Sequence, residues 1–205
     1  MEYKEYYRRH LPHIQPIGGT FFVTYCLYGS LPKEVFIALQ EEYEREKQHL
    51  EKDKKTTPKQ LDDCAKRYFL EVDKQLDGYP EGNHYLKDPR LAAIVAQTLH
   101  FWDNKKLELY AYCIMSNHVH TVFRLYGERE TPAPYTLDKI MQSIKSFSGK
   151  KCNEILRLSG KFWQEESYDR LVRNDTELRN ILIYVLNNPV KASLCKEMKD
   201  WAWSY

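Results

Sequence analysis

The sequence predicts an α+β fold in which an antiparallel β-hairpin and a separate strand pack against amphipathic helices. Apolar residues alternate along 107–115, and a strand-like run follows along 118–125. Only the tight pair Ser116-Asn117 separates the two runs, which is typical of a hairpin. Residues 20–28 are rich in β-branched and aromatic side chains and predict the separate strand. The segments between these strands repeat apolar residues at helical spacing.

Length and composition are those of one packed globular domain. The chain has 205 residues, of which 42% are hydrophobic and 14% are aromatic. The net charge is only +2, so a surface that binds nucleic acid would have to be a local basic patch. The 16 tyrosines suit both a core and stacking on nucleotide bases.

The cysteine pattern and the apolar runs indicate where the protein is located and which structural sites it lacks. The five cysteines are scattered and form no C-x-x-C pair, so neither a disulfide framework nor a structural zinc site is expected. The first residues contain no apolar signal-peptide core. No apolar run approaches the roughly 18 residues of a membrane span. We therefore expect a cytoplasmic protein with no membrane partner.

The first half of the chain is predicted to contain helices and a strand separated by irregular or highly charged segments. A basic, irregular segment at 8–19 precedes the first strand, and a helix is predicted from 33 to 49. Residues 50–77 are dense in charges of both signs, which is typical of a solvated helix or loop, and we interpret them as an insertion in a single domain spanning 1–205. A helix is predicted from 88 to 102 because Pro89 suits a first helical position and apolar residues follow at helical spacing.

The second half contains the hairpin and two further helices. Alternation along the first hairpin strand places five residues on one face: Leu107, Leu109, Ala111, Cys113 and Met115. A helix is predicted from 136 to 158, followed by an exposed aromatic segment at 162–164. The last helix begins at Asn174, with Glu177 completing a capping box, and ends at about Asn188 because Pro189 follows.

His118 and His120 are the most informative pair of residues. Residues i and i+2 of a strand share a face, so both imidazoles point the same way while Val119 points to the other side. Two neutral imidazoles so placed can hold a divalent metal ion. The alternative is that they are half-buried strand histidines bonded to their neighbours, because H-x-H is a short motif.

The last helix supplies a second candidate pair. Tyr184 and Asn188 are four residues apart and share a helix face. A tyrosine that faces a metal site can act as a nucleophile, and an asparagine carbonyl oxygen is a suitable ligand for Mg²⁺ or Mn²⁺. The alternative is that Tyr184 only packs and that Asn188 only ends the helix before proline.

Three motifs occur in a characteristic order: Asn117-His118-Val119-His120, then Phe162-Trp163-Gln164, then residues 184–192 with the sequence YVLNNPVKA. Together they resemble the REP-associated tyrosine transposases, relatives of the single-tyrosine insertion-sequence transposases of the HUH class. The basic first segment and the closing residues 201–204 are also similar to that family. The resemblance covers most of the chain except 50–77.

The resemblance implies a fold and a role for each matching residue. It implies a ferredoxin-like antiparallel sheet with helices packed on it. His118 and His120 match the metal-binding pair, with Mg²⁺ or Mn²⁺ as the cofactor, and Tyr184 matches the catalytic nucleophile. Asn188 stands where related enzymes have a third polar metal ligand. Ser193 stands where glycine is common in the family.

The implied reaction is nicking and rejoining of single-stranded or hairpin DNA at short palindromic repeats, through a 5′-phosphotyrosine intermediate, by a monomer or a homodimer. Two alternatives remain: a DNA-binding protein of the same fold that has lost cleavage, and a nickase of the replication-initiator or relaxase kind. Basic and aromatic side chains are the usual means of holding such DNA. The candidates by composition and position are Arg8, Arg9, Lys145, Lys150, Lys151, Trp163, Arg170 and Arg173.

Overall fold

The structure is a computed structural model and describes residues 6–8, 12–14, 16–131, 133 and 135–205. Contacts between residues divide the chain into two compact units. The sheet unit consists of Met1–Tyr28 and His84–Tyr205, and the hairpin unit consists of Gly29–Asn83. The predicted insertion at 50–77 lies inside the hairpin unit, which also contains the helix before it. That the whole chain acts as a single domain stays a prediction.

The sheet unit has the ferredoxin-like topology that was predicted. Within the described residues its main sheet has the strand order β4-β5-β3-β6, and every neighbouring pair is antiparallel. Two helices connect these strands in a β-α-β-β-α-β order, which is the split βαβ arrangement. The elements are β3 (Thr20–Cys26), α3 (Pro89–Trp102), β4 (Leu107–Ile114), β5 (His118–Leu125), α4 (Leu137–Leu156) and β6 (Tyr168–Leu171).

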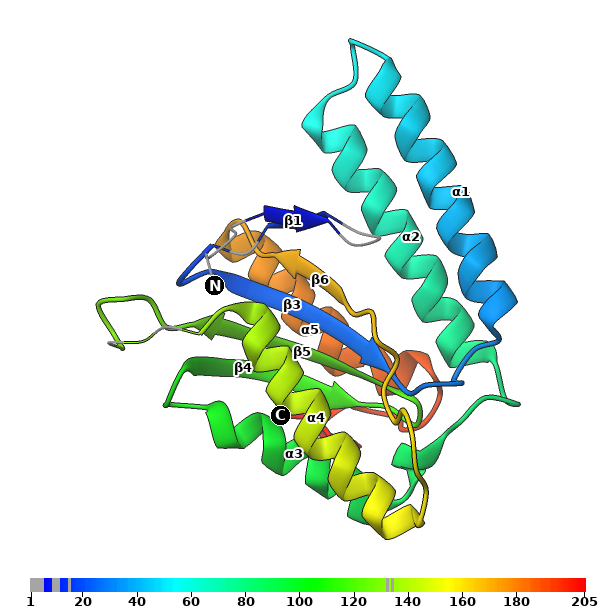
Figure 1. Cartoon of the computed structure of the whole chain (residues 1–205), viewed down its shortest axis with the longest axis vertical. Helices are drawn as coiled ribbons and strands as arrows, with labels where there is room; N and C mark the ends of the chain where they lie inside the picture. Colours follow the sequence, from blue (N-terminus) through cyan, green and yellow to red (C-terminus); the bar gives the residue numbers. More distant parts are fainter. Residues whose placement is uncertain (1–5, 9–11, 15, 132, 134) are drawn as a thin grey trace. The chain divides into compact units, whose positions relative to one another are not determined.

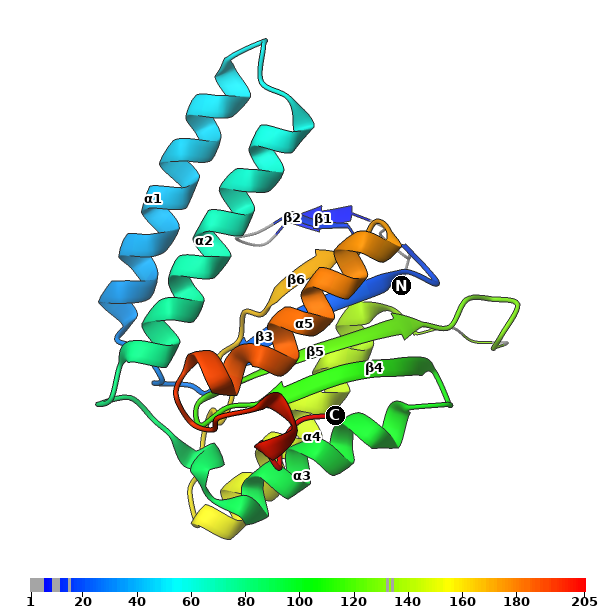
Figure 2. The ribbon, with the colours of Figure 1, turned by 180° about the vertical axis from the view of Figure 1, so that it is seen from behind.

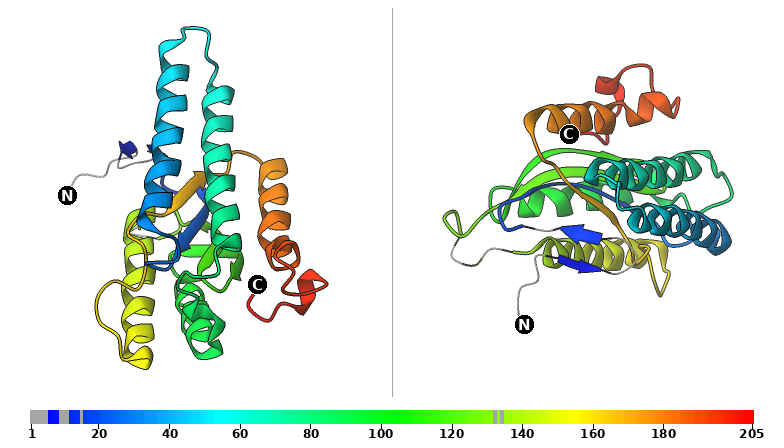
Figure 3. Two further views of the ribbon diagram at one scale, coloured as in Figure 1. Left: turned by 90° about the vertical axis from the view of Figure 1, so that its right-hand side faces the viewer. Right: turned by 90° about the horizontal axis from the view of Figure 1, so that it is seen from above.

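Helices cover both faces of this sheet. Helices α3 and α4 lie on the face that Figure 1 presents, and α5 (Asp175–Lys191) lies on the opposite face, which Figure 2 presents. The view from above in Figure 3 likewise places the yellow-green α4 and the orange α5 on opposite sides of the strands. The main core lies between the sheet and the α3/α4 layer and includes Val23, Val95, Val119, Phe123 and Ile140, each with no exposed surface.

The alternation of β5 fixes which face carries the histidines. Val119 and Phe123 enter the α3/α4 core, so His118 and His120 point toward α5. A slip of one residue in register would bury both imidazoles in that core and expel two apolar side chains. Each such side chain contributes about 1.5–3 kcal/mol by burial, so this register is strongly specified.

The predicted alternation of side chains along β4 is correct only as far as Leu109. The β4–β5 register shifts between Leu109 and Ala111, which leaves Tyr110 as a bulge. Beyond the bulge Ile114 lies opposite Val119 on the core face, while Cys113 lies opposite His120. The prediction that Ala111 and Cys113 share a face with Leu107 and Leu109 is therefore wrong, because the extra residue reverses the alternation.

The description of residues 162–164 as exposed is also wrong. Phe162 and Trp163 are only 5% and 6% exposed. Their segment extends the sheet beside β3, because Leu27 forms a bridge with Trp163 and Gln164 donates its backbone N–H to the carbonyl oxygen of Cys26. The strand β6 follows at once and was not predicted, since four residues with half-buried side chains carry little alternation.

Helix α5 continues through Pro189 to Lys191, two residues after Pro189, so the predicted end at Asn188 is too early. A proline can sit in the last turn when the carbonyl that it leaves unpaired lies near the helix end. The chain then leaves through Ser193, whose φ of 58° is in the left-handed region. This conformation explains in physical terms why glycine suits the position.

Two parts outside the main sheet complete the description. The first segment forms a two-stranded ribbon of β1 (Tyr6–Arg8) and β2 (Pro12–Ile14), where the sequence predicted irregular structure. The last residues lie along the outer edge of β4, where Tyr205 and Tyr112 exchange backbone hydrogen bonds of 3.0 and 3.1 Å. Short 3-10 turns occur at Tyr85–Lys87 and Met198–Asp200.

The hairpin unit consists of the helices α1 (Lys33–Lys52) and α2 (Pro58–Gly78). Thr57 and Gln60 form a capping box that starts α2, with Pro58 at its first position. Between the helices Tyr43 stacks on Tyr68 at 4.9 Å, and Arg67 pairs with Glu46.

Within the described ranges, every helix is too short or too polar to cross a bilayer.

Candidate metal and nucleophile site

His118 and His120 converge on one point beneath α5. Their side chains have no exposed surface, and their Nε2 atoms are 3.1 Å apart. The ring planes are inclined at 76°, so the two nitrogens meet edge to edge. Two cis ligands of an octahedral ion at about 2.1 Å are separated by roughly 3 Å, which matches this spacing. The predicted pairing of the two imidazoles on one face is therefore present in the structure.

The outer nitrogens of both rings are bonded to polar side chains. His118 Nδ1 lies 2.8 Å from Asn117 Oδ1, and His120 Nδ1 lies 2.7 Å from Thr24 Oγ1. Thr24 stands directly opposite His120 in the β3–β5 register, so the pairing of the strands brings the hydroxyl to the ring. Both histidines thus point their Nε2 atoms, and not their Nδ1 atoms, toward the shared point.

Asn188 reaches the same point from α5. Its side chain is 1% exposed, and its amide nitrogen lies 3.1 Å from His120 Nε2. Its Oδ1 is buried without a hydrogen-bond partner among the described residues. Exchanging the amide nitrogen and oxygen leaves the shape unchanged and turns the carbonyl oxygen toward the histidines.

The donor set fits a divalent ion. Two imidazole nitrogens and one amide oxygen, all buried and converging, can bind a divalent ion and leave coordination positions open, unlike a closed four-ligand zinc site. The buried Oδ1 without a partner is the kind of atom that a cation would satisfy. The residues present are therefore suitable for the metal that the sequence motif implies.

Tyr184 lies one helical turn before Asn188 and beside His120. Its half-buried ring lies 5.7 Å from the His120 ring and 6.1 Å from the Phe22 ring. On its other side, Lys191 Nζ lies 5.8 Å from the ring centroid. Since both Tyr184 and Asn188 contact His120, α5 presents the predicted face to the histidine strand.

The start of α5 is fixed to the sheet by polar contacts. Asn174 Oδ1 accepts the backbone N–H of Glu177, which confirms the predicted N-cap. The Glu177 carboxylate accepts from the backbone N–H of Arg173 and pairs with Arg170 on β6 at 2.6 Å. Arg170 and Glu177 are each 17% exposed in their side chains, so this ion pair is largely shielded from water.

The predicted DNA-binding residues are not brought together. Arg9 lies outside the described residues, and Arg8 is described only as backbone of β1. Arg170 is engaged with Glu177, and Arg173 is exposed at the start of α5. The other four candidates, Lys145, Lys150, Lys151 and Trp163, belong to α4 or to the segment after it, on the sheet face away from the histidines.

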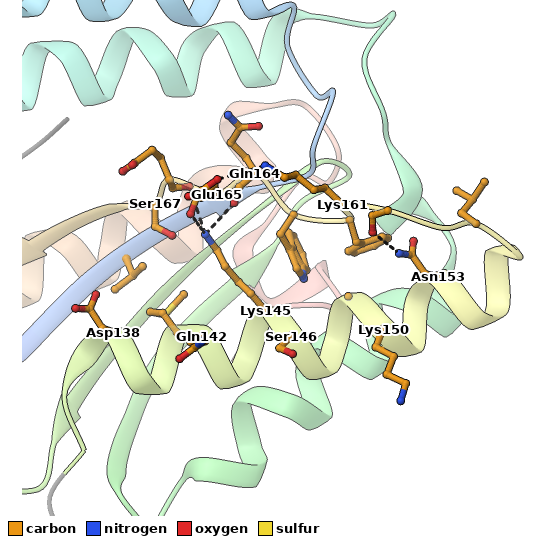
Figure 4. A pocket seen from close by; sticks show the side chains of 18 of the residues that line it. Asp138, Gln142, Lys145, Ser146, Lys150, Asn153, Lys161, Gln164, Glu165 and Ser167 are labelled. Atoms are coloured by element: carbon orange, nitrogen blue, oxygen red, sulfur yellow. Dashed lines mark hydrogen bonds and ion pairs between the residues drawn. The ribbon is translucent and has the colours of Figure 1, made fainter. Parts of the chain in front are cut away.

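A groove of about 950 Å³ lies between α4 and the segment that follows it. Figure 4 shows Lys145 reaching across it, where its Nζ donates to the carbonyl oxygens of Gln164, Glu165 and Glu166 at 3.0–3.3 Å. Lys150 is exposed at the rim, while Lys151, also exposed, pairs with Glu154 at 2.8 Å. Lys145 therefore holds the segment on α4, and contacts of Lys145, Lys150 and Lys151 with DNA stay predictions.

Trp163, a candidate for holding DNA, lies in the hydrophobic core of the sheet unit. Its indole packs against Tyr25 at 4.8 Å, and its Nε1 donates to Ser148 Oγ at 2.9 Å. Gly149 allows this close approach, because a Cβ at that position would lie 3.2 Å from the indole. A side chain so enclosed cannot offer a ring face to a base without local opening of the segment.

Two contacts at the site were not found by sequence reasoning. Thr24 was assigned only to a strand, and Asn117 only to a turn and a motif. The signal that could have found Thr24 is its polar side chain on the β3 face opposite the core, but the sequence does not tell which strand pairs with β5.

Comparison with known proteins gives a consistent family. Residues 84–188 match the family model described as "Transposase IS200 like". A REP-associated tyrosine transposase of Haemophilus influenzae is 28% identical over 102 residues, which cover 47% of this chain and 57% of that protein. The chain thus matches little more than half the length of that relative.

Two solved structures align with this chain to different extents. A REP-associated tyrosine transposase bound to a REP hairpin aligns with 97% of this chain and 80% of its own, with a TM-score of 0.54 and 16% identity. A transposase from Deinococcus radiodurans R1 aligns less well, with a TM-score of 0.32, 13% identity, and coverage of 82% of this chain and 89% of its own.

Proposed function

Because this chain belongs to the IS200-like transposase family, we propose that it nicks and rejoins single-stranded DNA through a covalent bond to Tyr184. The observation that carries the proposal is the position of the Tyr184 ring, 5.7 Å from the His120 ring and one helical turn from Asn188. A nucleophile, two imidazoles and an amide thus lie within one small region between α5 and β5.

The choice of Tyr184 over neighbouring tyrosines rests on their surroundings. Tyr25 is fully buried on the core face of β3, and burial raises the pKa of its phenol far above the ordinary value. Tyr168 shares the histidine face of the sheet, but the ring contact of its phenol is with Phe22 at 6.2 Å. Tyr184 is half-buried, and of these three tyrosines it is the one whose ring lies beside His120 itself.

The proposed step exchanges one phosphodiester bond for another of about the same free energy. The Tyr184 phenolic oxygen loses its proton and attacks a backbone phosphorus, the bond from phosphorus to the 3′ oxygen breaks, and that oxygen takes up a proton and leaves as a 3′-OH. The product is a 5′-phosphotyrosine bond. A 3′-OH of another strand can attack this bond, release Tyr184 and rejoin the DNA with no nucleotide cofactor.

His118, His120 and Asn188 would hold the divalent ion of this site. When bound, the ion, Mg²⁺ or Mn²⁺, would polarise the phosphate and stabilise negative charge in the transition state. Lys191, beside the Tyr184 ring, adds a positive charge near the same phosphate. Free tyrosine has a pKa near 10, so little phenolate forms in water at neutral pH without nearby positive charges.

The proposed substrate is DNA with a hairpin next to a single-stranded cleavage site, at short palindromic repeats. The support is the relative that was solved bound to a REP hairpin and that shares the fold. The proposal includes action in the cytoplasm, where such DNA is found.

The experiment uses labelled hairpin oligonucleotides taken from inverted repeats that flank the gene, incubated with the protein and Mn²⁺. On a denaturing gel, wild type should form a covalent adduct and Tyr184→Phe none, while hairpin affinity stays within about threefold. Tyr168→Phe is the matched control and should form the adduct normally. Hairpin binding by wild type without any adduct would instead favour the DNA-binding protein that has lost cleavage.

A further inference from the structure

We propose that Thr24 and Asn117 are positioning residues of the metal site, each fixing one histidine so that its Nε2 atom faces the ion. This inference rests on the metal site of the proposed function. Each residue would accept a hydrogen bond from the Nδ1–H of one imidazole, Thr24 from His120 and Asn117 from His118. Neither residue touches the ion or the substrate.

Thr24 is built into the sheet beside His120. Its side chain is 6% exposed, and its hydroxyl oxygen lies 2.7 Å from His120 Nδ1. The two residues are direct partners in the β3–β5 register, which is held by pairing along seven residues of each strand. The hydroxyl therefore has a fixed position relative to the ring, and rotation of the imidazole would break this bond.

Asn117 is equally fixed at the hairpin turn. Its side chain is 1% exposed, and its Oδ1 lies 2.8 Å from His118 Nδ1. Its backbone carbonyl accepts from Leu27 at 2.8 Å, and the preceding residue, Ser116, is bonded through its hydroxyl to His84 at 2.8 Å. With Oδ1 facing the ring, this contact requires the proton of His118 to be on Nδ1, because an amide carbonyl can only accept.

With Thr24 and Asn117 in these acceptor roles, both imidazoles carry their proton on Nδ1. With both protons on Nδ1, two Nε2 lone pairs face each other across 3.1 Å, an arrangement that a cation between them relieves. With a proton on either Nε2, that hydrogen would lie in the position of the ion. Polar groups that orient metal-binding histidines in this way typically change metal affinity by about 10–100-fold when removed.

The first test is the affinity of the full-length protein for Mn²⁺, measured by titration calorimetry. Thr24→Val and Asn117→Ala should each weaken binding by about 10–100-fold. Thr24→Ser keeps the hydroxyl and should bind within about threefold of wild type. Thr121→Val is the matched control, because Thr121 is a fully buried threonine on β5 whose side chain points away from the histidines.

The second test reads the tautomers directly by nitrogen-correlated NMR of the Mg²⁺-loaded protein. Wild type should show a protected Nδ1–H proton on both His118 and His120. Thr24→Val should remove the protection only at His120, and Asn117→Ala only at His118. A loss of packing alone would not follow this residue-by-residue pairing. An Nε2–H tautomer at either histidine of wild type would overturn the inference without any variant.

The outcomes separate this inference from the proposed function. If wild type binds Mn²⁺ and His118→Ala does not, but Thr24→Val and Asn117→Ala bind as wild type does, only the positioning roles are wrong. They are also wrong if Thr121→Val weakens binding as much as Thr24→Val. If wild type binds no Mn²⁺, the metal site and the positioning roles fail together.

Discussion

The rings of Tyr184 and His120 lie 5.7 Å apart, centroid to centroid, with their planes inclined at 72°. The tyrosine comes from a helix on one face of the sheet, and the histidine comes from the strand beneath it. Asn188, one turn further along the helix, contacts the same imidazole. This relationship joins two sequence motifs that are 64 residues apart in the chain.

Mn²⁺ should stabilise the folded protein through the histidine pair. Binding to the folded state at about 100 times the Kd adds roughly 2.7 kcal/mol to the free energy of unfolding. We expect this gain in wild type and in His49→Ala, which alters an exposed residue of α1, but not in His118→Ala. Thermal unfolding with Mn²⁺ and with excess chelator measures it. An equal gain in His118→Ala would place the ion elsewhere.

The ion pair between Arg170 and Glu177 should hold the nucleophile helix on the sheet. Arg170→Met leaves a shielded carboxylate without its partner, so we expect a loss of about 1–3 kcal/mol in the free energy of unfolding. The rate of adduct formation should fall as well, because the start of α5 loses its attachment. Arg179→Met alters an exposed residue of the same helix, α5, and serves as the control. Denaturant unfolding that finds equal stability for both variants would contradict this role.

Lys145 should contribute to stability, not to DNA affinity. Lys145→Met removes the donor for three carbonyl oxygens and should cost about 1–3 kcal/mol, since the part-buried acceptors lose their partner. Lys150→Met, on the same helix and exposed, should change stability by less than about 0.5 kcal/mol. The midpoints of denaturant unfolding report the difference. A Lys145→Met protein of normal stability with weakened hairpin binding would reassign Lys145 to the DNA.

Ser193→Gly should stabilise the protein, because residue 193 has a φ of 58°. Relief of the left-handed strain should exceed the entropy cost of glycine and raise the free energy of unfolding by about 0.5–1 kcal/mol. Ala192→Gly, at a neighbouring position with a φ of −79°, should lower it by a similar amount. Thermal unfolding compares the two variants. Destabilisation by both would mean that the Ser193 side chain makes a contribution larger than the strain.

Local patterns were enough to predict most of the elements. Strands β3, β4 and β5 and helices α1, α3, α4 and α5 lie within a few residues of their predicted positions, because each has clear periodicity or a capping residue. The bulge at Tyr110, the strand β6 and the turn of α5 beyond Pro189 were missed. Each of these depends on a neighbouring strand or helix, which local patterns do not reveal.

The candidate site shows the same division. His118 with His120, and Tyr184 with Asn188, follow from the periods of a strand and a helix, and their convergence was expected from the family resemblance. Thr24 reaches His120 only through strand pairing. The basic residues were chosen by charge and position alone. Neither property reveals that Arg170 pairs with Glu177 or that Lys145 donates to backbone carbonyl oxygens.

The most direct measurement is the identity of the tyrosine that becomes bonded to DNA. Wild type is incubated with the hairpin oligonucleotide and Mn²⁺, digested with nuclease and trypsin, and examined by mass spectrometry. Cleavage after Arg179 and Lys191 gives a peptide whose single tyrosine is Tyr184, and cleavage after Lys161 and Arg170 gives one whose single tyrosine is Tyr168. We predict a nucleotide adduct on the first peptide. An adduct on the second peptide, or on any other tyrosine, would contradict the assignment of Tyr184 as the nucleophile.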